Sequence, residues 1–140
     1  MKQKLWLETR LFLIGSIGYS LLEILWRGFT HWTMAVTGGF CFSALYFLNR
    51  RYESAPLWRK CLNGSLLITA AELVVGCIVN LGLHWQVWDY SKMPLNLWGQ
   101  ICLPYTGLWF LLSMPICFLT RFIRMQVEGK AFTKGKVLSK

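Results

Sequence analysis

The sequence predicts an all-α integral membrane protein, built as a bundle of four helices. Three observations carry this prediction: 55% of the 140 residues are hydrophobic, long apolar stretches recur along the chain, and nearly all basic residues lie on one side of those stretches. A soluble domain of this size needs more polar surface than this composition provides.

The four apolar stretches are residues 11–26, 32–48, 62–83 and 101–119. A membrane-spanning helix needs roughly 20 residues, so the first helix is expected to extend further toward the N-terminus. Pro56 separates the second helix from the third, and Pro104 and Pro115 are expected to kink or end the fourth. The predicted organisation is a single four-helix transmembrane domain, residues 1–121, followed by a basic cytoplasmic tail, residues 122–140.

The basic residues predict how the chain crosses the membrane. Thirteen of the fifteen Lys and Arg residues lie in residues 2–10, 50–60 and 121–140, and only Arg27 and Lys92 lie elsewhere. By the positive-inside rule, both termini and the middle connection are cytoplasmic, in a multi-pass protein of the cell membrane. The tail is expected to contact anionic lipid headgroups. A nucleic-acid partner is not expected, because no soluble module is left to bind it.

Two acidic residues lie inside the apolar stretches, Glu23 in the first and Glu72 in the third. Residues at steps of three and four share one face of a helix, so Ser and Thr residues form a polar stripe with each glutamate. The residues before the two glutamates also correspond to each other, as in a repeated sequence. The two copies begin on the same side of the membrane, which predicts two parallel-repeat helical hairpins. The residues that correspond at an offset of 49 are Gly15-Ser16 with Gly64-Ser65, Ser20 with Thr69, and Glu23 with Glu72.

The two glutamates differ in their sequence neighbours. A charged side chain in a membrane costs about 2.5 to 3.5 kcal/mol on insertion scales, so each glutamate is expected to have a structural or functional role. Glu23 precedes Arg27 by four residues, the favourable order for an ion pair on a helix. Glu72 has no cation nearby in sequence, and burial disfavours its ionised form. It is a candidate proton or cation site, unless Arg27 reaches it; the plainer alternative is a seam of hydrogen-bonded helices.

Metal, cofactor and catalytic signatures are not expected. His31 and His84 each precede a Trp of the interfacial aromatic belt, and no H-x-x-x-H or H-E-x-x-H spacing occurs. The five cysteines lack a C-x-x-C spacing and are predicted to be free thiols. The glycines of the tail, Gly129 and Gly135, do not have the spacing of a nucleotide phosphate loop. We therefore predict no metal, no cofactor and no bound ATP.

The segment from Trp85 to Trp98 is too polar to span a membrane and too aromatic to extend into water. Asp89 is expected to cap a turn with its own backbone amides or to pair with Arg27. Trp88 and Tyr90 are expected to pack down on the bundle. In this hypothesis the segment is a lid over the polar seam that leads to Glu72.

This part of the chain resembles the type IV ABC-transporter membrane proteins, a family also called CmpB-like. The resemblance covers most of residues 12–120 and implies a small multipass membrane protein with a role in transport. It places Glu23 and Glu72 where that family has helix acids, and it differs at Gln100, where the family often has Arg. The matching residues are Trp88, Asp89, Tyr90, Ser91, Pro94, Asn96, Gly99, Ile101, Cys102 and Trp109.

The predicted function is that of a transporter-type membrane component for a small ligand, an ion or a lipid. Four short helices enclose little volume, so a homo-oligomer or a partner membrane subunit is expected. One alternative is a membrane-embedded enzyme acting on a lipid or isoprenoid, which needs Asp89, Glu72 and Glu23 in one cavity. Another is a non-transporting assembly or regulatory subunit. The candidate ligand- or ion-binding residues are Glu23, Glu72, Arg27, Asp89, Ser20, Thr69, Trp88, Tyr90 and Asn96.

Overall fold

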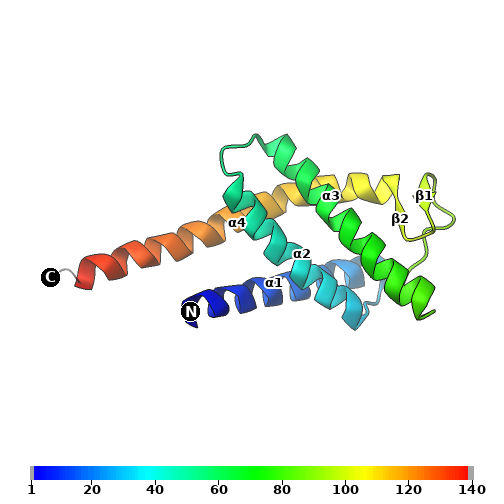
Figure 1. Cartoon of the computed structure of the whole chain (residues 1–140), viewed down its shortest axis with the longest axis horizontal. Coiled ribbons are helices and arrows are strands. Elements are labelled where there is room, and N and C mark those ends of the chain that lie inside the picture. Colours follow the sequence, from blue (N-terminus) through cyan, green and yellow to red (C-terminus); the bar gives the residue numbers. More distant parts are fainter. Residues whose placement is uncertain (1, 139–140) are drawn as a thin grey trace.

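A computed structural model describes residues 2–138 as four α-helices with a short hairpin between the last two (Figure 1). The elements in chain order are α1 (Lys2–Arg27), α2 (Trp32–Arg51), α3 (Leu57–Gly76), a π-helical turn η1 (Cys77–Gly82), β1 (Asn96–Leu97), β2 (Ile101–Cys102) and α4 (Leu103–Leu138). The predicted all-α class is therefore confirmed.

The helix boundaries follow local signals in the sequence. α1 ends where Gly28 adopts a φ of 80°, a left-handed conformation that closes a helix at little cost in glycine. α2 begins after His31, whose ring accepts a hydrogen bond from the backbone N–H of Thr33 at 3.3 Å. Pro56 precedes α3, as expected for a residue that cannot continue a helix.

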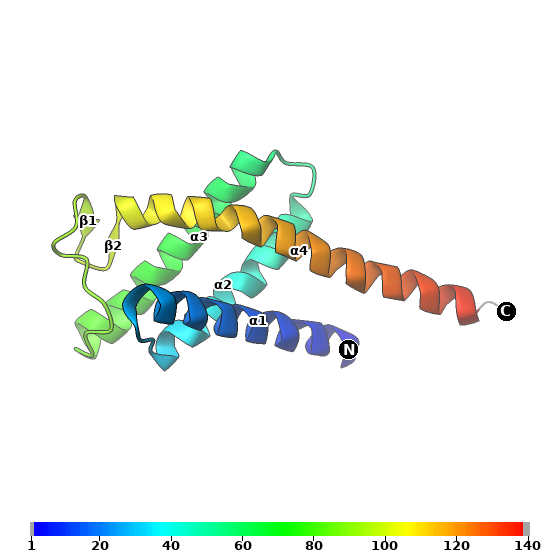
Figure 2. The ribbon, with the colours of Figure 1, turned by 180° about the vertical axis from the view of Figure 1, so that it is seen from behind.

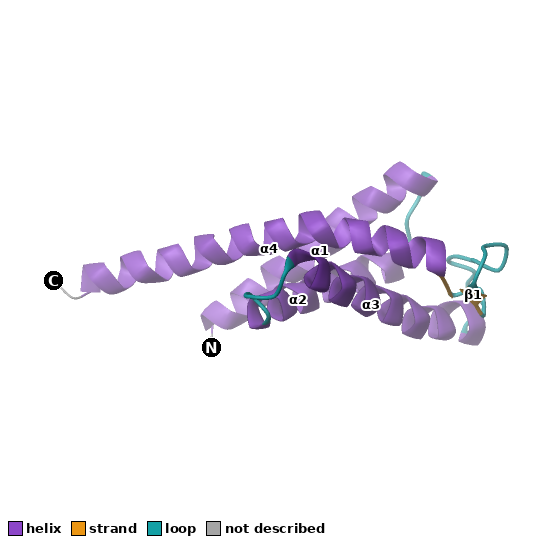
Figure 3. Ribbon diagram, turned by 90° about the horizontal axis from the view of Figure 1, so that it is seen from above, coloured by secondary structure: helices purple, strands orange, loops and turns teal. Residues whose placement is uncertain are grey.

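The fourth helix is longer than predicted. Pro115 lies inside α4 and does not end it, and the helix continues through the basic segment to Leu138. Membrane helices tolerate an internal proline where their neighbours supply the lost hydrogen bonds. α4 therefore extends beyond the other helices at its C-terminal end, as Figure 3 shows.

In the part of the chain that the structure describes, three segments are long and apolar enough to span a membrane: Gln3–Arg27, Leu57–Gly82 and Leu103–Gly129. The remaining helix, α2, packs against α1, α3 and α4. Its buried residues include Thr33, Thr37, Gly38 and Gly39, which lower its apolar character but face protein. A fourth crossing by α2 stays a prediction.

The helices pair as two hairpins. α1 packs mainly against α2, α3 packs mainly against α4, and α2 joins the two pairs. The start of α1 and the end of α4 lie toward one end of the molecule, and the connection between α3 and α4 lies at the other (Figures 1 and 2). We call this connection, residues 83–102, the aromatic loop.

The glycines that correspond at the offset of 49 occupy corresponding places in the two hairpins. A Cβ atom at Gly15 would lie 2.6 Å from the carbonyl oxygen of Gly38, so the absence of a side chain at Gly15 allows α2 to pack closely against α1. A Cβ atom at Gly64 would lie 2.4 Å from Oγ of Ser113, so the absence of a side chain at Gly64 allows α4 to pack closely against α3. Small residues at such crossings let helices approach closely in lipid. This correspondence supports the predicted repeat.

We expect Gly15→Ala to lower the free energy of unfolding by about 1 to 3 kcal/mol, the usual cost of overpacking. The added methyl group would meet the backbone of α2, which cannot move aside as a flexible side chain would. Gly18→Ala is the matched control, because nothing lies within 4 Å of its Cβ position. Unfolding by titration with dodecyl sulfate from mild micelles measures both variants. Equal stability of the two would contradict the close contact of α1 with α2.

Candidate functional site

Glu72 lies in the interior, on α3, with a side chain that is 2% exposed. Its Oε2 accepts a hydrogen bond from the indole Nε1 of Trp109, on α4, at 2.9 Å. Its Oε1 accepts a longer one from the hydroxyl of Tyr90, in the aromatic loop, at 3.4 Å. Among the described residues, no Lys, Arg or His forms an ion pair with Glu72. We call Glu72, Tyr90 and Trp109 the Glu72 cluster.

Tyr90 and Trp109 are held by further aromatic rings. Tyr90 stacks on Tyr105, the ring centroids 4.6 Å apart, and Tyr105 lies beside Trp109 at 6.1 Å. Tyr19 of α1 lies 6.1 Å from Trp109 on another side. Burial raises the pKa of the Tyr90 phenol well above its ordinary value, so Tyr90 keeps its proton and its hydroxyl donates a hydrogen bond to Glu72.

Gly76, one turn beyond Glu72 on α3, makes room for the aromatic loop. A Cβ atom there would lie 2.5 Å from Oε1 of Gln100 and 3.0 Å from the ring of Trp88. Trp88 is 7% exposed and packs with Met34 and Val79. The predicted packing of Trp88 onto the bundle is therefore confirmed.

Hydrogen bonds from η1 and within the loop fix this position. Asn80, in η1, donates to Oε1 of Gln100 at 2.8 Å and accepts from the backbone N–H of Val87 at 2.7 Å. The indole of Trp88 donates to the carbonyl of Gln100 at 3.0 Å. Gln100 itself donates to the carbonyl of Trp98 at 2.9 Å. The bonds of Asn80 to Gln100 and Val87, and of Trp88 to Gln100, are buried, so they tie the loop to η1 and α3 through contacts that water does not replace easily.

Asp89 and Asn96 build the turns of the loop rather than the Glu72 cluster. Asp89 accepts from the backbone N–H of Ser91 at 2.8 Å and from its hydroxyl at 2.9 Å. These two donors hold the pKa of Asp89 below its usual value, so the exposed carboxylate stays ionised at neutral pH. Asn96 donates to the carbonyls of Ser91 and Met93 at 3.2 and 2.9 Å. The predicted turn at Asp89 is confirmed, and the alternative pair with Arg27 is not formed.

The backbone of the loop is strained at several points. Four residues other than glycine have left-handed φ values of 50° to 56°: His84, Gln86, Leu95 and Trp98. Such conformations cost of order 1 kcal/mol or more each and persist only where the surroundings impose them. Gly99, at 68°, allows the turn between β1 and β2, and a Cβ atom there would lie 2.8 Å from Oδ1 of Asp89.

Glu23 and Arg27 form the predicted ion pair on α1, with 2.7 Å between Oε2 and Nη2. Thr30 also donates to Glu23, at 3.3 Å. Nη1 of Arg27 donates to the backbone carbonyl of Val87 at 2.9 Å and so ties α1 to the aromatic loop. Arg27 therefore does not reach Glu72. Glu23 and Glu72 nevertheless lie within electrostatic reach of one another, with Tyr19 close to both.

The small polar residues of the seam bond mainly to helix backbone and to each other. Ser65 donates to the carbonyl of Thr106 at 2.7 Å, and Thr69 bonds the hydroxyl of Thr106 at 3.1 Å. Ser20, the counterpart of Thr69, is half-buried on α1. These contacts fit the seam expected for packing in lipid. They join α3 to α4 beneath the Glu72 cluster.

The histidines and cysteines do not converge. Among the described residues, no group of three His, Cys, Asp or Glu side chains is placed to hold a metal ion. His31 caps α2 and lies against Trp32 and Trp85, and His84 is exposed in the loop. All five cysteines are free thiols in the structure, and three of them, Cys41, Cys61 and Cys102, are buried.

The comparison with protein families covers nearly the whole chain. The model of a family described as "Putative ABC-transporter type IV" matches residues 11–137. The chain belongs to this family. No curated protein and no solved structure matches it.

The residues that carried the resemblance to this type IV family converge in the structure. Tyr90 and Trp109 hold Glu72, Trp88 anchors the loop, and Asp89 and Asn96 shape it. The sequence prediction did not include Trp109, Asn80 or Gln100 among the candidate residues. Asn80 lies on the same helical stripe as Glu72, which was the available signal for it.

Proposed function

We propose that this protein is the membrane component of a transporter, in which a proton or a small cation meets the carboxyl group of Glu72 beneath the aromatic loop. The observation that carries the proposal is Glu72 itself, buried without a cationic partner among the described residues. An acid in such a place is either protonated or accompanied by a cation. Exchange between these two states is what an ion-coupled transporter uses.

The aromatic loop supplies the gate in this proposal. Tyr90 connects the loop to Glu72 through a long hydrogen bond, whereas Trp109 holds the carboxylate from α4 at a normal distance. Movement of the loop would therefore release one oxygen of Glu72 while the other stays bonded. A lid that opens and closes in this way controls access in many proteins.

The enzyme alternative has less support. It required Asp89 to join Glu72 and Glu23 in one cavity, but both oxygens of Asp89 are bonded to Ser91 at the exposed surface of the loop. A general acid or base must lie within hydrogen-bond reach of the reacting group. The remaining acids, Glu23 and Glu72, lie on different helices, α1 and α3, and each is bonded to a partner of its own, Arg27 and Trp109 respectively.

We further propose cytoplasmic termini in the cell membrane, and assembly as a homo-oligomer or with a partner membrane subunit. The asymmetry of Lys and Arg supports the orientation. Cysteines introduced at Lys92 and Lys130 and labelled with an impermeant thiol reagent check it: Lys92→Cys should react only from outside and Lys130→Cys only from inside.

Flux measurements in vesicles test the transport function. The purified protein in phosphatidylcholine vesicles should accelerate entry of protons, sodium or potassium under an imposed gradient, relative to protein-free vesicles. A hydrophobic carbodiimide reacts with protonated carboxyl groups in apolar surroundings, so pretreatment should abolish the flux and label Glu72. A parallel assay for movement of a fluorescent phospholipid covers a lipid substrate. If none of these species moves faster with protein than without it, the proposal is wrong.

A further inference from the structure

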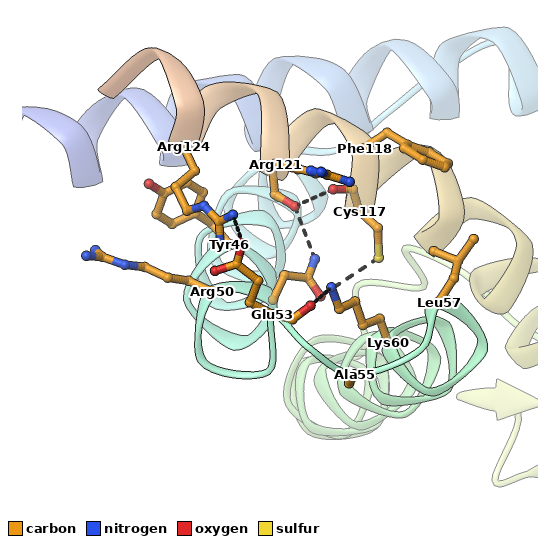
Figure 4. Close-up of a pocket in the computed structure, with 12 residues that line it drawn as sticks. Tyr46, Arg50, Glu53, Ala55, Leu57, Lys60, Cys117, Phe118, Arg121 and Arg124 are labelled. Carbon is orange, nitrogen blue, oxygen red and sulfur yellow. Dashed lines mark hydrogen bonds and ion pairs between the residues drawn. The ribbon is translucent and has the colours of Figure 1, made fainter. Parts of the chain in front are cut away.

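A cavity of about 330 Å³ lies between α2, α3 and α4, beside the connection from α2 to α3 (Figure 4). None of its lining residues belongs to the Glu72 cluster. Four of them are basic, and the one acidic residue is Glu53, which leaves three positive charges in excess. The basic residues are Arg50, Lys60, Arg121 and Arg124.

The ion pairs inside the cavity leave much of this charge unbalanced. Arg124 pairs with Glu53, across the cavity wall, and lies 4.0 Å from Glu128. Its Nε is buried and makes no hydrogen bond. Arg121 and Arg50 form no ion pair in the part of the chain that the structure describes. Lys60 donates one hydrogen bond, to the backbone carbonyl of Glu53 at 2.8 Å. Among the described residues, the guanidinium groups of Arg50 and Arg121 and the Nε of Arg124 therefore remain as donors without an acceptor.

The beginning of α3 adds backbone donors to these side chains. Pro56 provides no side-chain cap for α3, and its neighbours Ala55 and Leu57 both line the cavity. The first N–H groups of a helix have no partner within it and carry partial positive charge. An uncapped helix start beside arginines is a common way to hold a phosphate group.

We propose that this cavity is a binding site for a phosphate group, held by Arg121 and Arg124 of α4 and by Lys60 and the first turn of α3. Its volume is in the range of small-ligand pockets. The two arginines are three residues apart, so they share one face of α4. Arginine presents a planar fork that matches phosphate oxygens, whereas Lys60 acts as a compact charge.

Two sources can supply the phosphate group. The headgroup of an anionic phospholipid is one, because basic pockets between membrane helices on the cytoplasmic side bind such headgroups. A free phosphate or phosphate ester from solution is the other. Both use the same donors, so the two are separated by experiment. The site does not depend on transport through the Glu72 cluster.

The test uses the full chain in nanodiscs of phosphatidylcholine with a minor fraction of phosphatidylglycerol, followed by native mass spectrometry of the released protein. We expect retention of phosphatidylglycerol over phosphatidylcholine, and a loss of about tenfold or more in Arg121→Gln, since one charge-assisted bond is removed. Arg121→Lys should keep most of the binding because it keeps the charge. The matched control is Arg59→Gln, an exposed cation of the same region that stacks on Trp58 and does not line the cavity.

A second arm measures thermal stability in pure phosphatidylcholine nanodiscs with sodium phosphate or with chloride at equal ionic strength. Stabilisation by phosphate that disappears in Arg121→Gln identifies the free anion as a ligand, and retention of phosphatidylglycerol alone identifies the headgroup. Circular dichroism establishes that each variant is folded. An equal loss in Arg59→Gln, or no preference for either probe in the wild type, would overturn the proposal.

Discussion

Trp88→Ala is expected to lower the free energy of unfolding by about 3 to 5 kcal/mol, the range for removal of a buried aromatic side chain. Trp88 is 7% exposed, fits against Gly76, and donates its indole N–H to the carbonyl of Gln100 at 3.0 Å. The substitution leaves a cavity and an unpaired carbonyl in the same place.

Trp98→Ala is the matched control, because it removes the same ring from the same loop. Trp98 is 67% exposed, and only its backbone carbonyl takes part in the hydrogen bonds of the loop. A change within about 0.5 kcal/mol is expected for such a surface position. Titration with dodecyl sulfate, followed by circular dichroism, measures both variants. A small effect of Trp88→Ala, or an equal effect of Trp98→Ala, would mean that the loop is not anchored on α3 as described.

The local features of the fold could be predicted because they depend on residues close in sequence. The ion pair of Glu23 with Arg27 spans four residues, and the turn at Asp89 spans two. A helix fixes the first geometry, and the side chain of Asp fixes the second. The same is true of the helix boundary at Pro56, which follows from the covalent structure of proline.

The partners of Glu72 could not be predicted in this way. Its bond to Trp109 joins residues 37 positions apart, so it depends on how α3 and α4 are rotated about their axes. The rotation follows from the close crossing at Gly64 and from the bonds of Ser65 and Thr69 to Thr106. The polar stripe on α3 indicates that its side chains need hydrogen-bond partners, but it does not indicate which neighbouring helix provides those partners. The basic cavity was missed for the same reason, since its cations come from three helices.

The continuation of α4 could not be predicted from the apolar stretch, which ends at residue 119, or from Pro104 and Pro115, which were expected to kink or end the helix. Pro115 removes one backbone donor, which in water usually breaks a helix. In this bundle Pro115 is exposed, and α4 continues through it. The basic residues that follow belong to the same helix, which runs to Leu138. Arg121 and Arg124 consequently lie on a rigid element above the cavity.

Glu72→Gln is expected to reduce transport to the level of protein-free vesicles while the protein remains folded. The amide can be accommodated because the two partners of Glu72 differ. The indole of Trp109 can only donate, so it bonds the carbonyl oxygen of glutamine, whereas the hydroxyl of Tyr90 can also accept from the amide nitrogen. The hydrogen bonds survive, and only the ability to bind a proton or a cation is lost.

Glu23→Gln is the comparison variant, because it removes the other carboxylate of the apolar segments and shows whether the loss of transport is specific to Glu72. Its side chain and that of Arg27 are 13% and 22% exposed, so the substitution leaves a partly buried guanidinium without its charge partner. We expect a loss of stability of about 1 to 3 kcal/mol, with most of the flux retained. The proton or cation flux of vesicles and the unfolding titration measure the two effects separately. Full flux in Glu72→Gln would exclude a coupling role for Glu72 and leave it as a structural acceptor for Trp109 and Tyr90.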